Sequence, residues 1–285
     1  MTGLLLLLAV LPSIILGYIV YKNDKIEKEP TKLLVKLFLG GILSIVITLI
    51  ITGLEYILFP NIGELEKINY ITQFIYCFIG IAVIEEFSKW IILRSYTWNS
   101  KEFKHLYDAI VYACFVSLGF ATLENILYVL QNGLGTALIR AIISVPGHFF
   151  FAVFMGIYYG LARKCYTYKD MEGYKKNIAL SVLIPTLLHT AFDFCLLSEN
   201  MLFLLIFLGM MIALYIISFG KLFFIADIKE NFVKDNLITV RPLNFQSSYR
   251  TVQTGPVGGC KYCPNCGNLN KDENLFCTSC GWKFL

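Results

Sequence analysis

The chain has 285 residues, of which 57% are hydrophobic and only 15% are charged, and its mean hydropathy is +0.66. Soluble domains carry about 25% charged and about 45–50% apolar residues, so this composition excludes an ordinary soluble enzyme and an intrinsically disordered chain. The formal net charge of +4 is small, which argues against a dedicated nucleic-acid-binding protein. We therefore expect the lipid bilayer to surround most of the chain.

Seven apolar stretches are long enough to cross a bilayer, since a helical span needs about 20 apolar residues. In chain order they are residues 3–21, 33–59, 71–93, 106–130, 136–161, 178–197 and 201–219. Because the connection between the last two spans is very short, we expect these two to be antiparallel neighbours. The predicted fold class is an all-α polytopic membrane protein with about seven transmembrane helices.

The loops predict how these spans are oriented. Lysine and arginine gather in the first, third and fifth loops and after the last span, whereas the even-numbered loops hold one lysine, Lys67. Cytosolic loops carry an excess of these residues, so the N-terminus is predicted outside and the C-terminus in the cytosol. We expect a multi-pass protein of the cell membrane whose first span is retained as an anchor.

The composition changes after Ala226, where the apolar spans end. Residues 227–259 are polar and contain prolines and a glycine pair, which is typical of a linker. Two Cys-x₂-Cys pairs follow, each trailed by a glycine, at Cys263, Cys266, Cys277 and Cys280. Such knuckles direct four thiolates at one zinc ion, and so short a segment needs a metal in order to fold. We predict a bundle at 1–226, a linker at 227–259 and a small cytosolic zinc ribbon at 260–285.

Two alternatives concern the same cysteines. A pair of disulfides would fit the spacing, but the predicted cytosolic location is reducing. Cys260 also forms a Cys-x₂-Cys spacing with Cys263, and we favour the later four cysteines because both pairs then end in glycine. Structural zinc with four thiolates has no open coordination position, so the ribbon is expected to serve folding or docking rather than chemistry.

Four consecutive predicted spans, the third to the sixth, contain ionisable side chains. A charge at mid-membrane costs at least about 2.5–3.5 kcal/mol, so each is a functional hypothesis by default. These residues are Glu85, Glu86, Lys89, Glu124, Arg140, His148, His189 and Asp193, with Asn125 beside Glu124. At a rise of about 1.5 Å per residue, the two histidines fall near the midplane and Glu124 and Asp193 nearer the outer face. We predict a polar site that is enclosed by the bundle and runs from the midplane outward.

The spacing along each helix brings some of these groups onto one face. His189 and Asp193 are four residues apart, and so are Glu85 and Lys89, in the order that favours an ion pair. Glu86 lies about 100° around the helix from Glu85 and points elsewhere. The pair of Glu85 and Lys89 is equally compatible with a structural clamp.

Imidazoles and carboxylates at similar depth are the ligand set of a catalytic zinc ion, with one carboxylate left over as general base. His148 and His189 are therefore candidate ligands of an intramembrane metal. Arg140 lies near the end of its predicted span, and we expect its side chain to reach the membrane interface instead.

Four motifs stand in order along these spans. They are E-E-x-x-K at 85–89, F-x-x-x-E-N at 120–125, Pro-Gly-His at 146–148 and H-x-x-x-D at 189–193, while the loop at 24–30 supplies a further element. Together they resemble the PrsW family of bacterial intramembrane proteases, and a set of ordered motifs is more specific than any one of them. The resemblance covers residues 3–221 and leaves out the zinc-ribbon tail.

The resemblance implies a protease that cuts a membrane-anchored protein near or within the bilayer. The best-known role of the family is site-1-type cleavage of a single-pass anti-sigma factor in stress signalling, so such a substrate and the lipid bilayer are the expected partners, with no nucleic acid. The family also looks related to the CAAX-protease-like group. Its members are commonly called metallopeptidases, and relatives have been argued to use glutamate-activated water without metal, so both catalytic types stay open.

Roles for the residues follow as a hypothesis. Glu85 or Glu86 would take a proton from water, with Lys89 keeping the neighbouring carboxylate charged. Asn125 is a candidate donor to the oxyanion. The remaining polar residues would bind zinc or orient water and polarise the carbonyl: Glu124, His148, His189 and Asp193.

Two interpretations from other classes compete with the protease. Buried Glu, His and Asp residues also form proton pathways in transporters, although neither an internal repeat nor a pair of broken spans marks one here. A non-catalytic scaffold that presents the zinc ribbon would tolerate substitutions in the polar spans but not in the ribbon.

Overall fold

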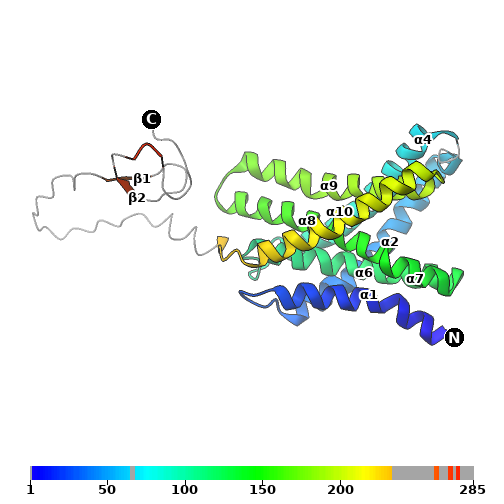
Figure 1. Cartoon of the computed structure of the whole chain (residues 1–285), viewed down its shortest axis with the longest axis horizontal. Helices are drawn as coiled ribbons and strands as arrows, with labels where there is room; N and C mark the ends of the chain where they lie inside the picture. The colour runs from blue at the N-terminus through cyan, green and yellow to red at the C-terminus, as the bar shows by residue number, and fades with distance from the viewer. Residues whose placement is uncertain (1, 65–67, 233–259, 263–268, 272–273, 277–285) are drawn as a thin grey trace, which may run out of the picture. The chain divides into compact units, whose positions relative to one another are not determined.

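The computed structural model describes residues 2–64, 68–232, 260–262, 269–271 and 274–276. The chain divides into two compact units, Met1–Val240 and Arg241–Leu285. The first unit is a bundle of helices (Figure 1). The predicted multi-pass, all-α membrane fold is thereby confirmed for this unit.

The described part of the second unit includes a two-stranded antiparallel sheet. Strand β1 (Cys260–Tyr262) pairs with β2 (Leu269–Lys271), with Cys260 opposite Lys271. The four predicted zinc ligands, at 263, 266, 277 and 280, lie outside the described residues. The zinc ribbon and the domain boundaries drawn from the sequence therefore stay predictions.

Helices of the first unit follow the predicted spans closely. In chain order they are α1 (Thr2–Asn23), α2 (Thr31–Leu58), η1 (Ile62–Glu64), α4 (Tyr70–Ile75), η2 (Tyr76–Val83), α5 (Ile84–Thr97), α6 (Leu106–Asn132), α7 (Leu134–Ile142), α8 (Ser144–Thr167), α9 (Met171–Leu197) and α10 (Met201–Ala226). Within the described residues, six stretches of helix are each long and apolar enough to cross a membrane, the stretch from Leu134 to Thr167 being counted as one.

The third predicted span is continuous but not uniform. It consists of α4, η2 and α5 in direct succession, and η2 is a π-helix. A π-helix is wider than an α-helix and often marks a functional site inside a longer helix. Here the π-helix directly precedes α5, whose first turn contains Glu85 and Glu86.

The fifth predicted span is broken into α7 and α8. Pro146 stands in the first turn of α8, and it has no N–H to donate to the carbonyl group four residues earlier, at Ile142. Helix α7 ends at that residue, and Ile143 has a backbone conformation of φ −110° and ψ −64°. The break separates the short α7 from the start of α8, where Gly147 and His148 follow the proline.

Helices α6 and α8 form the centre of the bundle and lie between α1 and α9 (Figure 1). Large aromatic side chains that are almost fully buried fill the space around them: Phe103, Tyr112, Phe149, Phe150, Phe151 and Tyr159. In a bilayer the lipid tails are as apolar as these side chains, so close packing rather than removal from water holds the helices together.

The backbones of α2 and α6 approach each other closely where the two helices cross. A Cβ atom added to Gly41 would overlap the carbonyl oxygen of Val116, and one added to Gly119 would overlap the carbonyl oxygen of Phe38. Small residues at such a crossing let two membrane helices meet backbone to backbone.

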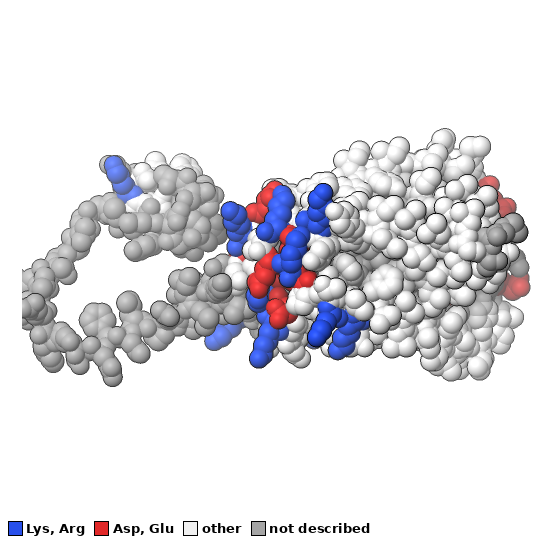
Figure 2. All heavy atoms as spheres, turned by 90° about the horizontal axis from the view of Figure 1, so that it is seen from below, with Lys and Arg blue, Asp and Glu red and all other residues white. Residues whose placement is uncertain are grey.

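Charged side chains gather in a band at one end of the bundle, and the rest of this face is almost free of them (Figure 2). This end, which we call the basic end, carries the connections at 24–30, 98–105 and 168–170 together with residues 227–232. The first residues of the predicted linker thus contact the bundle: Asp227 pairs with Lys25 at 2.7 Å, Glu230 pairs with Lys164 at 2.8 Å, and the buried Phe232 donates its N–H to the carbonyl of Lys104 at 2.8 Å.

Candidate active site in the helix bundle

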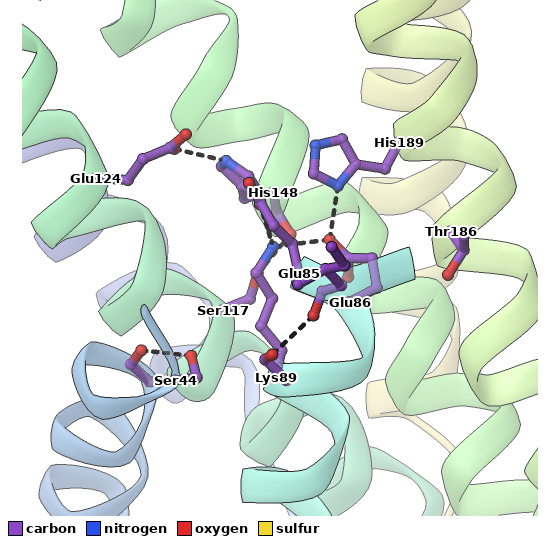
Figure 3. Close-up of polar contacts among 12 residues, drawn as sticks. Ser44, Glu85, Glu86, Lys89, Ser117, Glu124, His148, Thr186 and His189 are labelled. Carbon is purple, nitrogen blue, oxygen red and sulfur yellow. Dashed lines mark hydrogen bonds and ion pairs between the residues drawn. The ribbon is translucent and has the colours of Figure 1, made fainter. Parts of the chain in front are cut away.

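The side chain of Lys89 lies at the centre of the polar groups inside the bundle (Figure 3). It is almost fully buried, and its Nζ atom donates to Glu86 Oε1 at 2.7 Å and to Glu85 Oε2 at 3.4 Å. The same ammonium group lies 3.2 Å from His148 Nδ1. The predicted ion pair of Glu85 and Lys89 is therefore present, and Lys89 makes a shorter ion pair with Glu86, three residues before it.

This contact fixes the tautomer of His148. An ammonium group can only donate hydrogen bonds, so His148 Nδ1 must accept and the ring proton lies on Nε2. The Nε2–H then donates to Glu124 Oε2 at 2.9 Å. The backbone is held as well, because the Ser117 hydroxyl donates to the His148 carbonyl at 2.9 Å. Helix α6 therefore orients this histidine at both its side chain and its backbone.

The second histidine faces the same cluster from α9. His189 Nδ1 lies 2.9 Å from Glu86 Oε1, and its Nε2 atom lies 3.3 Å from Asp193 Oδ2. The rings of His148 and His189 are 5.3 Å apart and almost perpendicular. The predicted convergence of the third, fourth, fifth and sixth spans on one site is thus present in the structure.

Arg140 does not reach toward the interface, so the expectation for this residue was wrong. Its Nη2 atom donates to Glu124 Oε2 at 2.7 Å, and its Nε atom donates to Asn125 Oδ1 at 3.0 Å. Helix α7 carries it back toward the site, because the break before α8 redirects the chain.

Asn125 is fully buried and is held between two neighbours. Its amide group donates to the carbonyl of Ala9 on α1 at 2.9 Å, while its side-chain oxygen accepts from Arg140. The predicted role of Asn125 as oxyanion donor has no support in this placement, because the residue does not line the pocket described next.

A pocket of about 280 Å³ opens beside the cluster. Apolar side chains of η2, α7, α8 and α9 form part of its wall, and its polar lining consists of Glu85, Glu124, Tyr128, Arg140, Ser144, His148, His189 and Asp193. Glu86 and Lys89 are absent from this lining. The two adjacent glutamates therefore differ in placement: Glu85 faces the pocket, whereas Glu86 is enclosed behind it with the lysine.

Four residues of the polar cluster have the side-chain types that bind metal ions. Single ligand atoms of Glu85, Glu86, His148 and His189 all lie within 4.8 Å of one another, and two imidazoles with carboxylates suit zinc. Glu86 Oε2 is also buried and has no hydrogen-bond partner among the described residues. These residues therefore fit a metal ion by donor type. The ammonium of Lys89 now occupies the lone pair of His148 Nδ1, so a metal ion would take the place of this cation.

A multi-pass helical bundle that buries carboxylates, imidazoles and a lysine around a pocket at membrane depth has the architecture of a membrane-embedded enzyme. Residues 29–219 match the model of the PrsW family of intramembrane metalloproteases. The chain belongs to this family of intramembrane proteases, as its motifs indicated. This assignment favours the protease interpretation over the transporter and the scaffold.

Curated relatives agree with the family model. The chain is 37% identical over 211 residues to "Protease PrsW" of Oceanobacillus iheyensis, which covers 74% of this chain and 91% of the relative. It is 35% identical over 185 residues to the Bacillus subtilis protein of the same name (65% and 79%) and 32% identical over 225 residues to that of Clostridioides difficile (76% and 90%). No solved structure matches the chain.

Proposed function

We propose that this protease hydrolyses a peptide bond in a single-pass membrane protein, with Glu85 as the general base. The observation that carries the assignment is the placement of the adjacent glutamates, since only Glu85 faces the pocket. A carboxylate that takes a proton from water must lie where water and the peptide meet. Glu86 is enclosed with Lys89 and His189, and a positioning role suits it.

The chemistry divides between these groups. Glu85 accepts a proton from water as the oxygen of that water bonds to the peptide carbonyl carbon, and it later returns the proton to the leaving amine. His189 and Asp193 line the same pocket and orient the water. His148 is held by Glu124 and Lys89 as a neutral ring. A metal ion held by Glu86, His148 and His189 would supply a Lewis acid that makes water more acidic.

The position of the pocket favours a cut toward the outer face of the membrane. By the positive-inside rule the basic end of the bundle is cytosolic. Helices α6 and α9 both start at this end, and Glu124 lies about 27 Å along α6 from its first residue at 1.5 Å per residue. Asp193 stands in the last turns of α9. The pocket therefore lies in the outer half of the bundle.

An anti-sigma factor is the substrate that we infer, on the strength of the family resemblance. The test is co-expression of the protease with single-pass anti-sigma factors of the same genome, with an epitope tag on each side of the membrane segment. We expect one shortened product from the wild type and none from Glu85→Gln. A form that ends at Phe232, and so lacks the predicted ribbon but keeps the docked residues 227–232, is expected to cleave normally. Cleavage by Glu85→Gln at the wild-type rate would overturn the assignment.

A further inference from the structure

Arg140 presents a cation to the pocket that holds Glu85. The side chain lines the pocket together with Glu85, His189 and Asp193. Lys89, the other cation of this cluster, does not line it. Among the described residues of the pocket wall, Arg140 is therefore the permanent positive charge that a bound peptide can touch, because a guanidinium group stays protonated in proteins.

The guanidinium group is held rigidly on one edge. Nη2 donates to Glu124 and Nε donates to Asn125, whose own amide is anchored to the Ala9 carbonyl. The ring of Tyr128 lies against the group, with its centroid 4.1 Å from Arg140 Cζ. No described residue accepts a hydrogen bond from Nη1, so the second edge is left for a ligand.

Arg140 lies on α7, a short helix that is separated from both α6 and α8. Helix α7 begins after Gly133, whose φ of +78° turns the chain at the end of α6, and it ends at the break before Pro146. Its lipid-facing side chains are apolar and exposed, as in Leu138 and Ile142. Arg140 therefore enters the pocket from the wall formed by α7, while Glu85 enters it from α5.

We propose that Arg140 is a catalytic residue that binds the carbonyl oxygen of the scissile peptide bond through Nη1 and stabilises the oxyanion. The proposal rests on the proposed function. As water adds to the carbonyl carbon, the electron pair of the C=O bond moves to oxygen, and Glu85 takes the proton. The negatively charged oxygen then accepts a hydrogen bond from Arg140 Nη1. When this electron pair re-forms the C=O bond, the C–N bond breaks and the leaving amine takes its proton from Glu85. Fixed donors aimed at such an oxygen are among the largest contributions to catalysis.

The experiment compares Arg140→Gln and Arg140→Lys with the wild type on a substrate that the wild type cleaves. Loss of one oxyanion donor lowers kcat by about 10²- to 10³-fold, and we expect a fall of this size for Arg140→Gln with KM almost unchanged. Arg140→Lys keeps the charge but loses the forked donors of the guanidinium group. We expect its kcat to lie between that of the wild type and that of Arg140→Gln. The matched control is Arg94→Gln, because Arg94 is a partly buried arginine in the last turn of α5 that bonds Tyr174 and does not line the pocket.

A second comparison separates catalysis from simple support of Glu124. In a Glu124→Gln background, a supporting role predicts that Arg140→Gln has no further effect, whereas a catalytic role predicts a further fall in kcat. Equal kcat for wild type and Arg140→Gln, or no further fall in that background, would overturn the proposal. If wild type and Arg94→Gln cleave nothing, it is the proposed function that has failed, and Arg140 is not at issue.

Discussion

Glu85 and Glu86 are neighbours in sequence, yet the helix turns them toward different surroundings. Glu85 lines the pocket, and Glu86 accepts from Lys89 and His189 in a closed space. The helical offset of about 100° between adjacent residues accounts for this separation. At the scale of single residues, one carboxylate faces the pocket and the other is enclosed with its cationic partner Lys89.

Two substitutions should separate these roles. Glu85→Gln keeps the shape of the side chain and removes its basicity, so we expect kcat to fall by about 10²- to 10⁴-fold. Because its contact with Lys89 is the longer one, at 3.4 Å, the melting temperature should fall less than for Glu86→Gln. Glu86→Gln removes one partner of a buried ion pair, which costs about 3–5 kcal/mol of stability, so the melting temperature should fall as well. Thermal unfolding in detergent, beside a cleavage assay, measures both quantities.

Glu172→Gln is the matched control for this pair, since Glu172 is exposed in the first turn of α9. We expect it to change neither quantity. A Glu86→Gln protein as stable as the wild type, together with a fully active Glu85→Gln protein, would reverse the assignment.

Sequence reasoning located most of the site residues but not all of their contacts. Helical depth brought His148 and His189 to one level, because depth depends only on the regular rise of the helix. The same arithmetic failed for Arg140, since it assumed one straight span through residues 136–161. Pro146 was the signal that could have corrected it, because a proline ends the hydrogen-bonded helix before it.

At the scale of elements, the crossing of α2 and α6 fixes the wall from which Glu124 projects. Gly41 and Gly119 let the two backbones touch, and any side chain at either position would overlap a carbonyl oxygen. The apolar composition of both helices predicted that they span the membrane, yet it could not predict which pair would cross. That choice depends on small residues from segments far apart in sequence.

Gly41→Ala should therefore destabilise the bundle, because neither backbone can move without shifting the other helix. Overpacking of this kind costs about 1–3 kcal/mol, and we expect the melting temperature and the cleavage rate to fall together. Gly53→Ala is the control on the same helix, since no atom lies within 4 Å of an added Cβ at that position. An unchanged melting temperature for Gly41→Ala would contradict the close crossing.

At the scale of the whole molecule, the basic end contains a buried acidic cluster that ties the connection at 24–30 to α6 and to the connection at 98–105. The Tyr112 hydroxyl donates to Glu29 Oε2 at 2.6 Å, and Asp24 Oδ2 accepts from the Glu29 N–H at 3.3 Å. Burial, reinforced by the nearby carboxylate of Asp108, raises the pKa of Asp24 to about 6 and raises the pKa of Glu29 well above its ordinary value. A hydrogen bond to Asp108 likewise raises the pKa of His105.

All three shifts have the same consequence for stability. A raised pKa in the folded state means that folding binds protons, so the contribution to stability is present at low pH and is lost as pH rises through the folded value. We expect the melting temperature in detergent to decrease from about pH 5 to about pH 9. Glu29→Gln, which mimics the neutral carboxyl group, should flatten much of this decrease and raise stability at alkaline pH. A melting temperature that rises with pH in the wild type would contradict this prediction.

Metal content distinguishes the two catalytic types that the sequence left open. If Glu86, His148 and His189 hold an ion, a purified form that ends at Phe232 should retain about one zinc per chain after the predicted ribbon is removed. His148→Ala with His189→Ala should abolish this zinc while the helical content is kept. A truncated protein that is free of metal and fully active would assign the chemistry to the glutamate and its water alone.

In the proposed function, the bundle itself hydrolyses a peptide bond at the pocket of Glu85. The most direct measurement is mass spectrometry of the products after the purified protease and a single-pass substrate are reconstituted in liposomes. We predict two fragments whose masses sum to that of the substrate plus one water, with the cut in the outer half of the membrane segment, and no fragments from Glu85→Gln. A cut on the cytosolic side of the segment, or the same fragments from Glu85→Gln, would contradict the account.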